Sequence, residues 1–178
     1  MEKFKITDTI QVDGKNIYLF NKPFHMRMEE EGFSDTYSGR GISSYHHKLE
    51  NEADWLIYPS LQKCEIMIVS PSGEFTSEEA LQFISINNGI ALTRDNLFML
   101  CALFPDRLKE YKGLLAIMHK QFLPNHGNGP KIMPKVDINI EKDYPPEKVT
   151  FYYDWWWYDG KQKNPFVFMK PSLIKSYY

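Results

Sequence analysis

The middle of the chain alternates hydrophobic and polar residues with the period of a helix. Between residues 76 and 89 the apolar positions with helical spacing are Ala80, Phe83 and Ile84. Thr76 and Glu79 have the spacing of a capping box, in which each side chain accepts a hydrogen bond from the other residue's backbone N–H. Asn88-Gly89 follows and predicts a left-handed turn that ends the helix. This segment is the clearest predicted helix of the chain.

A second helix is predicted shortly after the first. Ile90–Leu92 is short and apolar, as expected for an extended link, and Thr93 then offers an N-cap. We expect the helix to continue to about Phe104, because Pro105 cannot donate the next backbone hydrogen bond. The apolar stretch 108–122 fits either a further helix or a strand.

Short apolar runs on both sides of the two helices predict β-strands. Asp13-Gly14 supplies the positive φ angles of a tight turn and predicts a β-hairpin around it. The predicted strands are Thr9–Val12, Lys15–Phe20, Trp55–Pro59, Glu65–Val69, Val136–Ile140, Val149–Tyr158 and Phe166–Met169. This order indicates an α+β fold, with two consecutive helices packed on a small antiparallel β-sheet. We expect residues 1–60 to form an N-terminal β extension with a long polar loop at 32–51, and residues 61–178 to form the α+β core.

The most distinctive segment is the aromatic run Phe151–Gly160, in which three tryptophans are adjacent. Successive side chains of a strand point to opposite faces, so the run divides into two sets. The odd-numbered set is Tyr153, Trp155 and Trp157, and the even-numbered set is Tyr152, Asp154, Trp156 and Tyr158. One set is expected in the core. The even-numbered set combines rigid rings with polar groups, as binding faces do, and the following turn with Lys161 and Asn164 would form its rim. Core packing, or contact with a second copy of the chain, is the alternative use of such residues.

Composition narrows the function classes. The 178 residues are 43% hydrophobic and 25% charged, with a net charge of −2, which is ordinary for a globular protein. This charge gives no general attraction to nucleic acid or to an anionic membrane. The second predicted helix begins Arg94-Asp95-Asn96 and then becomes apolar, which leaves little to read DNA bases. We find neither a secretory leader nor a run of about twenty apolar residues, and so expect a cytoplasmic protein.

Few residues indicate catalytic chemistry. Cys64 and Cys101 lie in apolar contexts and are expected to be buried free thiols. The best candidates for a general base are His46 and His47, which have acidic residues nearby at Glu50, Glu52 and Asp54. A small hydrolase that uses these loop histidines is therefore the enzymatic alternative. Neither spacing nor neighbours fit a zinc site, and we expect no metal and no cofactor.

The order of helix, Asn-Gly turn, apolar link and capped second helix over Ser77–Thr93 resembles the opening of a C-type-lectin-like domain. Trp157–Gly160 and Pro165–Phe168 are similar to that family's penultimate and last strands, as in bacterial and phage ligand-display relatives. The resemblance covers roughly residues 65 to 170. The family's disulfide cysteines are missing, and Tyr158 stands where an asparagine would bind calcium. The resemblance therefore implies a binding fold, without calcium or calcium-dependent sugar binding.

These observations together predict a non-enzymatic binding module that engages a protein ligand through a C-terminal aromatic surface. The predicted ligand-binding residues are Tyr152, Asp154, Trp156, Tyr158, Lys161 and Asn164. Two alternatives stay open, the small hydrolase with His46 and His47 and a viral or mobile-element inhibitor of a host protein.

Overall fold

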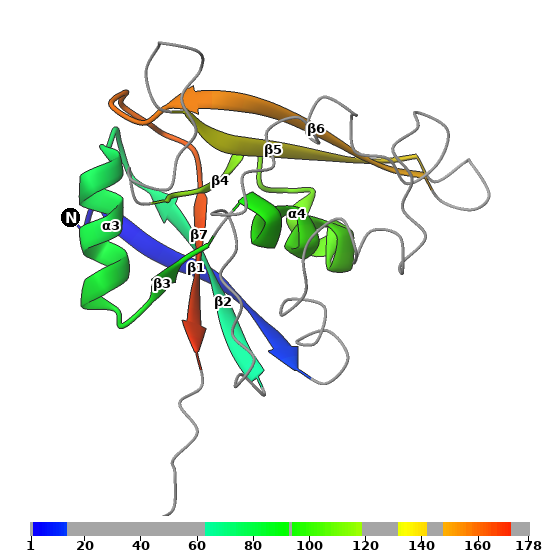
Figure 1. Cartoon of the computed structure of the whole chain (residues 1–178), viewed down its shortest axis with the longest axis horizontal. Coiled ribbons are helices and arrows are strands. Elements are labelled where there is room, and N and C mark those ends of the chain that lie inside the picture. The colour runs from blue at the N-terminus through cyan, green and yellow to red at the C-terminus, as the bar shows by residue number, and fades with distance from the viewer. Residues whose placement is uncertain (1, 14–62, 93, 119–131, 142–147, 172–178) are drawn as a thin grey trace, which may run out of the picture.

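The computed structural model describes residues 2–13, 63–92, 94–118, 132–141 and 148–171. They form a mixed α+β structure in which helices lie on both faces of one mostly antiparallel sheet (Figure 1). The elements are β1 (Phe4–Asp13), β2 (Lys63–Pro71), α3 (Ser77–Ile86), β3 (Ile90–Ala91), α4 (Arg94–Leu103), α5 (Pro105–Leu108), β4 (Leu114–Ala116), β5 (Ile132–Glu141), β6 (Lys148–Trp157) and β7 (Phe166–Pro171). The predicted α+β class is thus confirmed. In this part of the chain, every helix is too short or too polar to cross a bilayer.

The sheet places its last strand at the centre. The strand order is β1-β2-β7-β4-β5-β6, and all neighbours along it are antiparallel except β4 and β7, which are parallel. Two short strands share one side of β7: β4 pairs with Phe166 and Val167, and β3 pairs with Phe168 and Met169. β1 pairs with β2 along its whole length, so the N-terminal strand is part of the main sheet.

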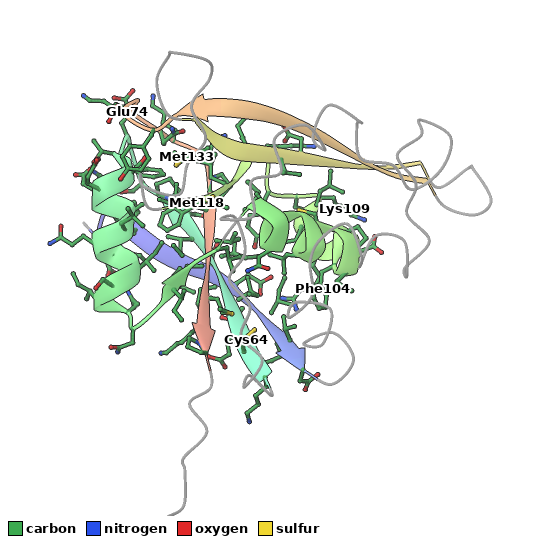
Figure 2. All side chains as sticks on the ribbon, viewed as in Figure 1. Cys64, Glu74, Phe104, Lys109, Met118 and Met133 are labelled. Carbon is green, nitrogen blue, oxygen red and sulfur yellow. The ribbon has the colours of Figure 1, made fainter. Side chains whose placement is uncertain are left out.

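The hydrophobic core has two clusters, one on each face of the sheet. The α3-side cluster includes Phe4, Phe75, Ala80, Ile84, Leu115, Met133, Phe166 and Phe168. The α4-side cluster includes Cys64, Ile66, Leu97, Leu100, Leu108, Val136, Ile138, Val167 and Met169. Figure 2 shows Met118 and Met133 beside α3, whereas Phe104 and Lys109 lie with α4 and α5. The two predicted helices therefore pack on opposite faces, and a strand between them, such as β7, is buried on both sides.

The predicted capping of α3 is confirmed. Thr76 Oγ1 accepts a hydrogen bond from Glu79 N at 3.3 Å, and Glu79 Oε2 accepts one from Thr76 N at 2.8 Å. The left-handed turn after the helix is also present, with φ of 55° at Asn88. Gly89 has a different role, because a Cβ at this position would lie 2.3 Å from Cδ2 of Phe168. The second residue of the turn is glycine to make room for a core ring.

Most of the other predicted helices and strands can be compared with the structure. α4 ends at Leu103, close to the predicted boundary, and Pro105 opens α5 rather than a loop. Within the stretch 108–122, Leu114–Ala116 is strand. Four of the predicted strands, Thr9–Val12, Glu65–Val69, Val136–Ile140 and Phe166–Met169, are confirmed inside longer strands, and Val149–Tyr158 is confirmed as far as Trp157. The predicted strands Lys15–Phe20 and Trp55–Pro59 and the polar loop 32–51 lie outside the described residues.

Candidate functional site

The aromatic run forms β6, which lies at one edge of the described sheet and pairs only with β5 there (Figure 1). The two strands pair over ten consecutive residues without a register shift. Directly paired residues of an antiparallel ladder lie on the same face of the sheet. The register therefore assigns the positions of β6 to faces through their partners in β5, whose burial is described at Met133 and from Lys135 to Ile138.

The odd-numbered positions of β6 share a face with the α4-side core. Tyr153 pairs with Val136 and Phe151 pairs with Ile138, and both partners are buried in the α4-side cluster. On the opposite, α3-side face, Trp156 pairs with Met133, Asp154 with Lys135, and Tyr152 with Asp137. Met133 is buried in the α3-side cluster, whereas Lys135 and Asp137 are polar and only half-buried. On this face β5 is thus buried at Met133 and polar and half-buried at Lys135 and Asp137.

Further polar groups converge on this face at the start of β4. Asp137 Oδ1 accepts a hydrogen bond of 2.7 Å from the backbone N–H of Gly113, whose φ is +64°. A Cβ on Gly113 would lie 2.2 Å from Asn164 Nδ2 and 3.1 Å from Lys135 Cδ, so these two side chains meet above the glycine. Asn164 Nδ2 also donates to Lys112 O at 3.5 Å. The predicted rim residue Asn164 therefore lies beside Lys135, the register partner of Asp154.

Tyr158, another predicted contact residue, is buried in the α3-side cluster, with 3% of its surface exposed. Its carbonyl accepts a hydrogen bond of 2.8 Å from the buried Ser77 Oγ at the start of α3. Burial, and after it the Glu78 carboxylate that accepts from the phenol, raises the pKa of Tyr158 above its ordinary value of 10.0. Tyr158 connects the end of β6 to α3 and is not part of the exposed surface of the protein.

The turn after β6 is held to the residue before α3. Phe75 and Gln162 exchange two backbone hydrogen bonds, of 2.9 and 2.8 Å. Lys161 is exposed, and its Nζ lies 3.9 Å from Oε2 of Glu74, while Lys163 Nζ lies 3.6 Å from Oε1 of the same carboxylate. The two predicted rim residues thus lie apart: Asn164 lies beside Lys135, and Lys161 lies beside Glu74.

The described residues offer little for covalent or metal chemistry. Cys64 and Cys101 are buried free thiols, as predicted. Burial raises the pKa of Cys64 to about 12 and raises that of Cys101 as well, so neither forms a nucleophilic thiolate at neutral pH. Among these residues no three His, Cys, Asp or Glu side chains are grouped to hold a metal ion. His46 and His47 lie outside them.

Sequence reasoning missed Lys135 and Asp137 as members of this face. The signal was present, because polar residues alternate with the apolar Val136, Ile138 and Ile140 along β5. Such period-two alternation marks a strand with one buried and one open face. It was used only to predict the strand.

Comparison with known proteins adds no relative: no protein family, no curated protein and no solved structure matches this chain. The functional argument therefore depends on the geometry alone.

Proposed function

We propose that this protein is a non-enzymatic binding module that captures a protein partner on the α3-side face of the β5–β6 pair. The central contacts would come from Tyr152, Asp154 and Trp156 of β6. The observation that carries the proposal is the register of β6 with β5: Tyr152 pairs with Asp137 and Asp154 with Lys135, two half-buried polar residues, and Trp156 pairs with Met133 beside them.

The chemistry of this face suits recognition of a folded protein surface. Tyrosine and tryptophan bring large contact areas and lose little side-chain entropy on binding. Lys135, Asp137 and Asn164 place an ammonium, a carboxylate and an amide beside them, which supports a polar rim around an aromatic centre. Lys161 extends that rim on the side of Glu74.

A matched pair of tryptophan substitutions tests the proposal. Trp156→Ala should reduce capture of partner proteins from a cell lysate by at least about tenfold, as expected for a hot-spot residue. Its melting temperature should stay near that of the wild type. Trp155→Ala, at the neighbouring position on the α4-side face, should instead lower the melting temperature. If Trp156→Ala unfolds the protein and Trp155→Ala does not, the two faces are exchanged and the proposal fails.

The finer fold proposal is a C-type-lectin-like core with an N-terminal β extension. It is supported by the order α3, Asn88-Gly89, β3 and α4, and by the position of β7 directly after the aromatic strand. A bound partner that belongs to a host cell would favour the variant in which the module is a viral or mobile-element inhibitor. Identifying the captured protein by mass spectrometry distinguishes these settings.

A further inference from the structure

The two edges of the described sheet are built differently. At the β1 edge the register with β2 shifts between Ile6 and Asp8. Arg107 covers the same place: its Nη2 lies 2.6 Å from both carboxylate oxygens of Asp8 and 3.3 Å from the carbonyl oxygen of Thr9. Irregular pairing and charged side chains are the means by which natural sheets keep an edge from adding another strand.

The β6 edge has no irregular pairing in the described part of the chain and carries few charges. β6 is a ten-residue strand without proline or glycine, and its ladder with β5 has no shift. Its only charged residues are Lys148 and Asp154. Figure 1 shows β6 as the outermost strand on its side of the sheet. A long, regular edge of this kind is a template for one more strand.

We propose that β6 pairs with β6 of a second copy of this chain, antiparallel and about a two-fold axis at Phe151. The two sheets would then join into one continuous sheet across the dimer. This register places Lys148 opposite Asp154 of the partner subunit, and the symmetry repeats the pair. It also places Val149 and Thr150 opposite two tyrosines of the partner, and such β-branched and aromatic pairs stabilise neighbouring strands.

The charges of β5 strengthen the choice of register. Within one chain Glu141 pairs with Lys148, and Lys135 pairs with Asp154. Four neighbouring strands of the dimer would therefore place Glu141, Lys148, the partner's Asp154 and the partner's Lys135 in one row. The charge changes sign from each of these residues to the next. An axis at Asp154 would place two carboxylates opposite each other, and an axis at Tyr152 would leave both charges of β6 opposite uncharged residues. Only the register centred on Phe151 pairs every charge.

The dimer goes beyond the proposed function and depends on the backbone edge of β6, whereas binding of a protein partner uses the α3-side face. Asp154 contributes to both, so Trp156→Ala tests partner capture and the charge exchange tests dimerisation. Because the axis is perpendicular to the sheet, the α3-side faces of both copies would lie side by side. The dimer would thus present one surface with two aromatic patches.

A charge exchange tests the register in the full-length protein. By sedimentation velocity, the wild type should be a dimer at micromolar concentration, and Asp154→Lys and Lys148→Asp should each weaken the dimer by about tenfold. An equimolar mixture of the two variants should dimerise as the wild type does, because every pair across the axis is again of opposite charge. Asp13→Lys on β1 makes the same charge change at the other edge and should leave the dimer intact.

Several results would overturn the proposal. One is a wild type that stays monomeric up to concentrations on the order of 100 μM, as when another part of the same chain occupies the edge. Another is a dimer that both charge variants leave unchanged, or folded variants whose mixture does not regain the dimer.

If the charge variants fold poorly, a pair of cysteine substitutions tests the register of the dimer instead. Thr150→Cys and Tyr152→Cys should form a disulfide-linked dimer faster when mixed than either variant does alone, because the two positions face each other across the axis. Equal or faster linkage in either single variant would overturn the register. Capture of a partner by the face would be unaffected by that result, and Trp156→Ala tests it separately.

Discussion

The centre of the sheet and the β5–β6 pair use aromatic residues in opposite ways. In β7, all four residues from Phe166 to Met169 are buried, because α3 covers one face and α4 the other. In β5, Val136 and Ile138 are buried on the α4-side face, whereas Lys135 and Asp137 on the α3-side face are half-buried. A continuous apolar run is required at the centre of the sheet, but β6 has no such requirement on its α3-side face.

This difference bears on the role of the aromatic residues in β6. Buried rings in the centre stabilise the fold: Phe4, Phe75 and Phe166 have ring centroids 5.3 to 5.5 Å apart. Positions 152 and 156 of β6 pair with half-buried Asp137 and buried Met133 of β5. In the proposed function, the aromatic residues at these two positions serve binding rather than folding.

The largest expected effect separates the two regions by stability. Phe168→Ala removes a ring that is 0% exposed and should lower the free energy of unfolding by about 3–5 kcal/mol. Lys135→Ala, on the polar face of β5, should lower it by about 1 kcal/mol or less. Urea unfolding followed by circular dichroism measures both. Comparable losses for the two variants would show that the β5–β6 face is as closely packed as the centre.

The local parts of this fold were predictable, and the long-range parts were not. Thr76 and Glu79 determine the start of α3 within three residues, so their pattern alone predicts the cap. The place of β7 between β2 and β4 depends on pairing between residues about a hundred positions apart, which no local pattern encodes. The apolar stripes of α3 and α4 predict one buried side for each helix. They do not tell which face of the sheet each helix covers.

The candidate site shows the same limit. Alternation along β6 divides the aromatic residues into two sets, but it does not show how much of each face other elements cover. Tyr158 lies in the α3-side cluster, on the side of the other even-numbered positions, and Ser77 at the start of α3 donates a hydrogen bond to its carbonyl oxygen. Tyr158 is buried there because α3 covers it. The contact of Asn164 with Lys135 depends on the turn after β6 folding against Gly113, which also requires the assembled sheet.

Two glycines give an intermediate test of the same comparison. Gly89→Ala directs a methyl group against the buried ring of Phe168 and should cost about 1–3 kcal/mol of stability, since the ring has no free space to move into. Gly113→Ala meets the amide end of Asn164, a half-exposed side chain that can rotate away, and its main cost is the positive φ, about 1 kcal/mol. Thermal unfolding ranks the two. Gly113→Ala should also weaken partner capture, because it displaces Asn164 from Lys135, whereas Gly89→Ala should not change capture by the folded protein.

The smallest expected effect concerns how α3 is attached to the two regions. Towards β1, Lys3 Nζ lies 2.5 Å from Glu79 Oε1, and this hydrogen bond, followed by that from Thr76 N–H, holds the pKa of Glu79 below its ordinary value of 4.5. A carboxyl whose folded pKa is depressed contributes stability above its unfolded pKa, and that contribution is lost as the pH falls through the folded pKa.

Glu79→Gln keeps an acceptor for the cap but removes the charge, so its melting temperature should lie slightly below the wild type at pH 7 and converge with it as the pH falls through the lowered pKa of the Glu79 carboxyl. Towards β6, the attachment is the neutral hydrogen bond from Ser77 to Tyr158, so the loss caused by Ser77→Ala should be the same across this pH range. If the difference in melting temperature between Glu79→Gln and the wild type does not change with pH, the charge of Glu79 does not stabilise the attachment of α3 to the β1 side of the sheet.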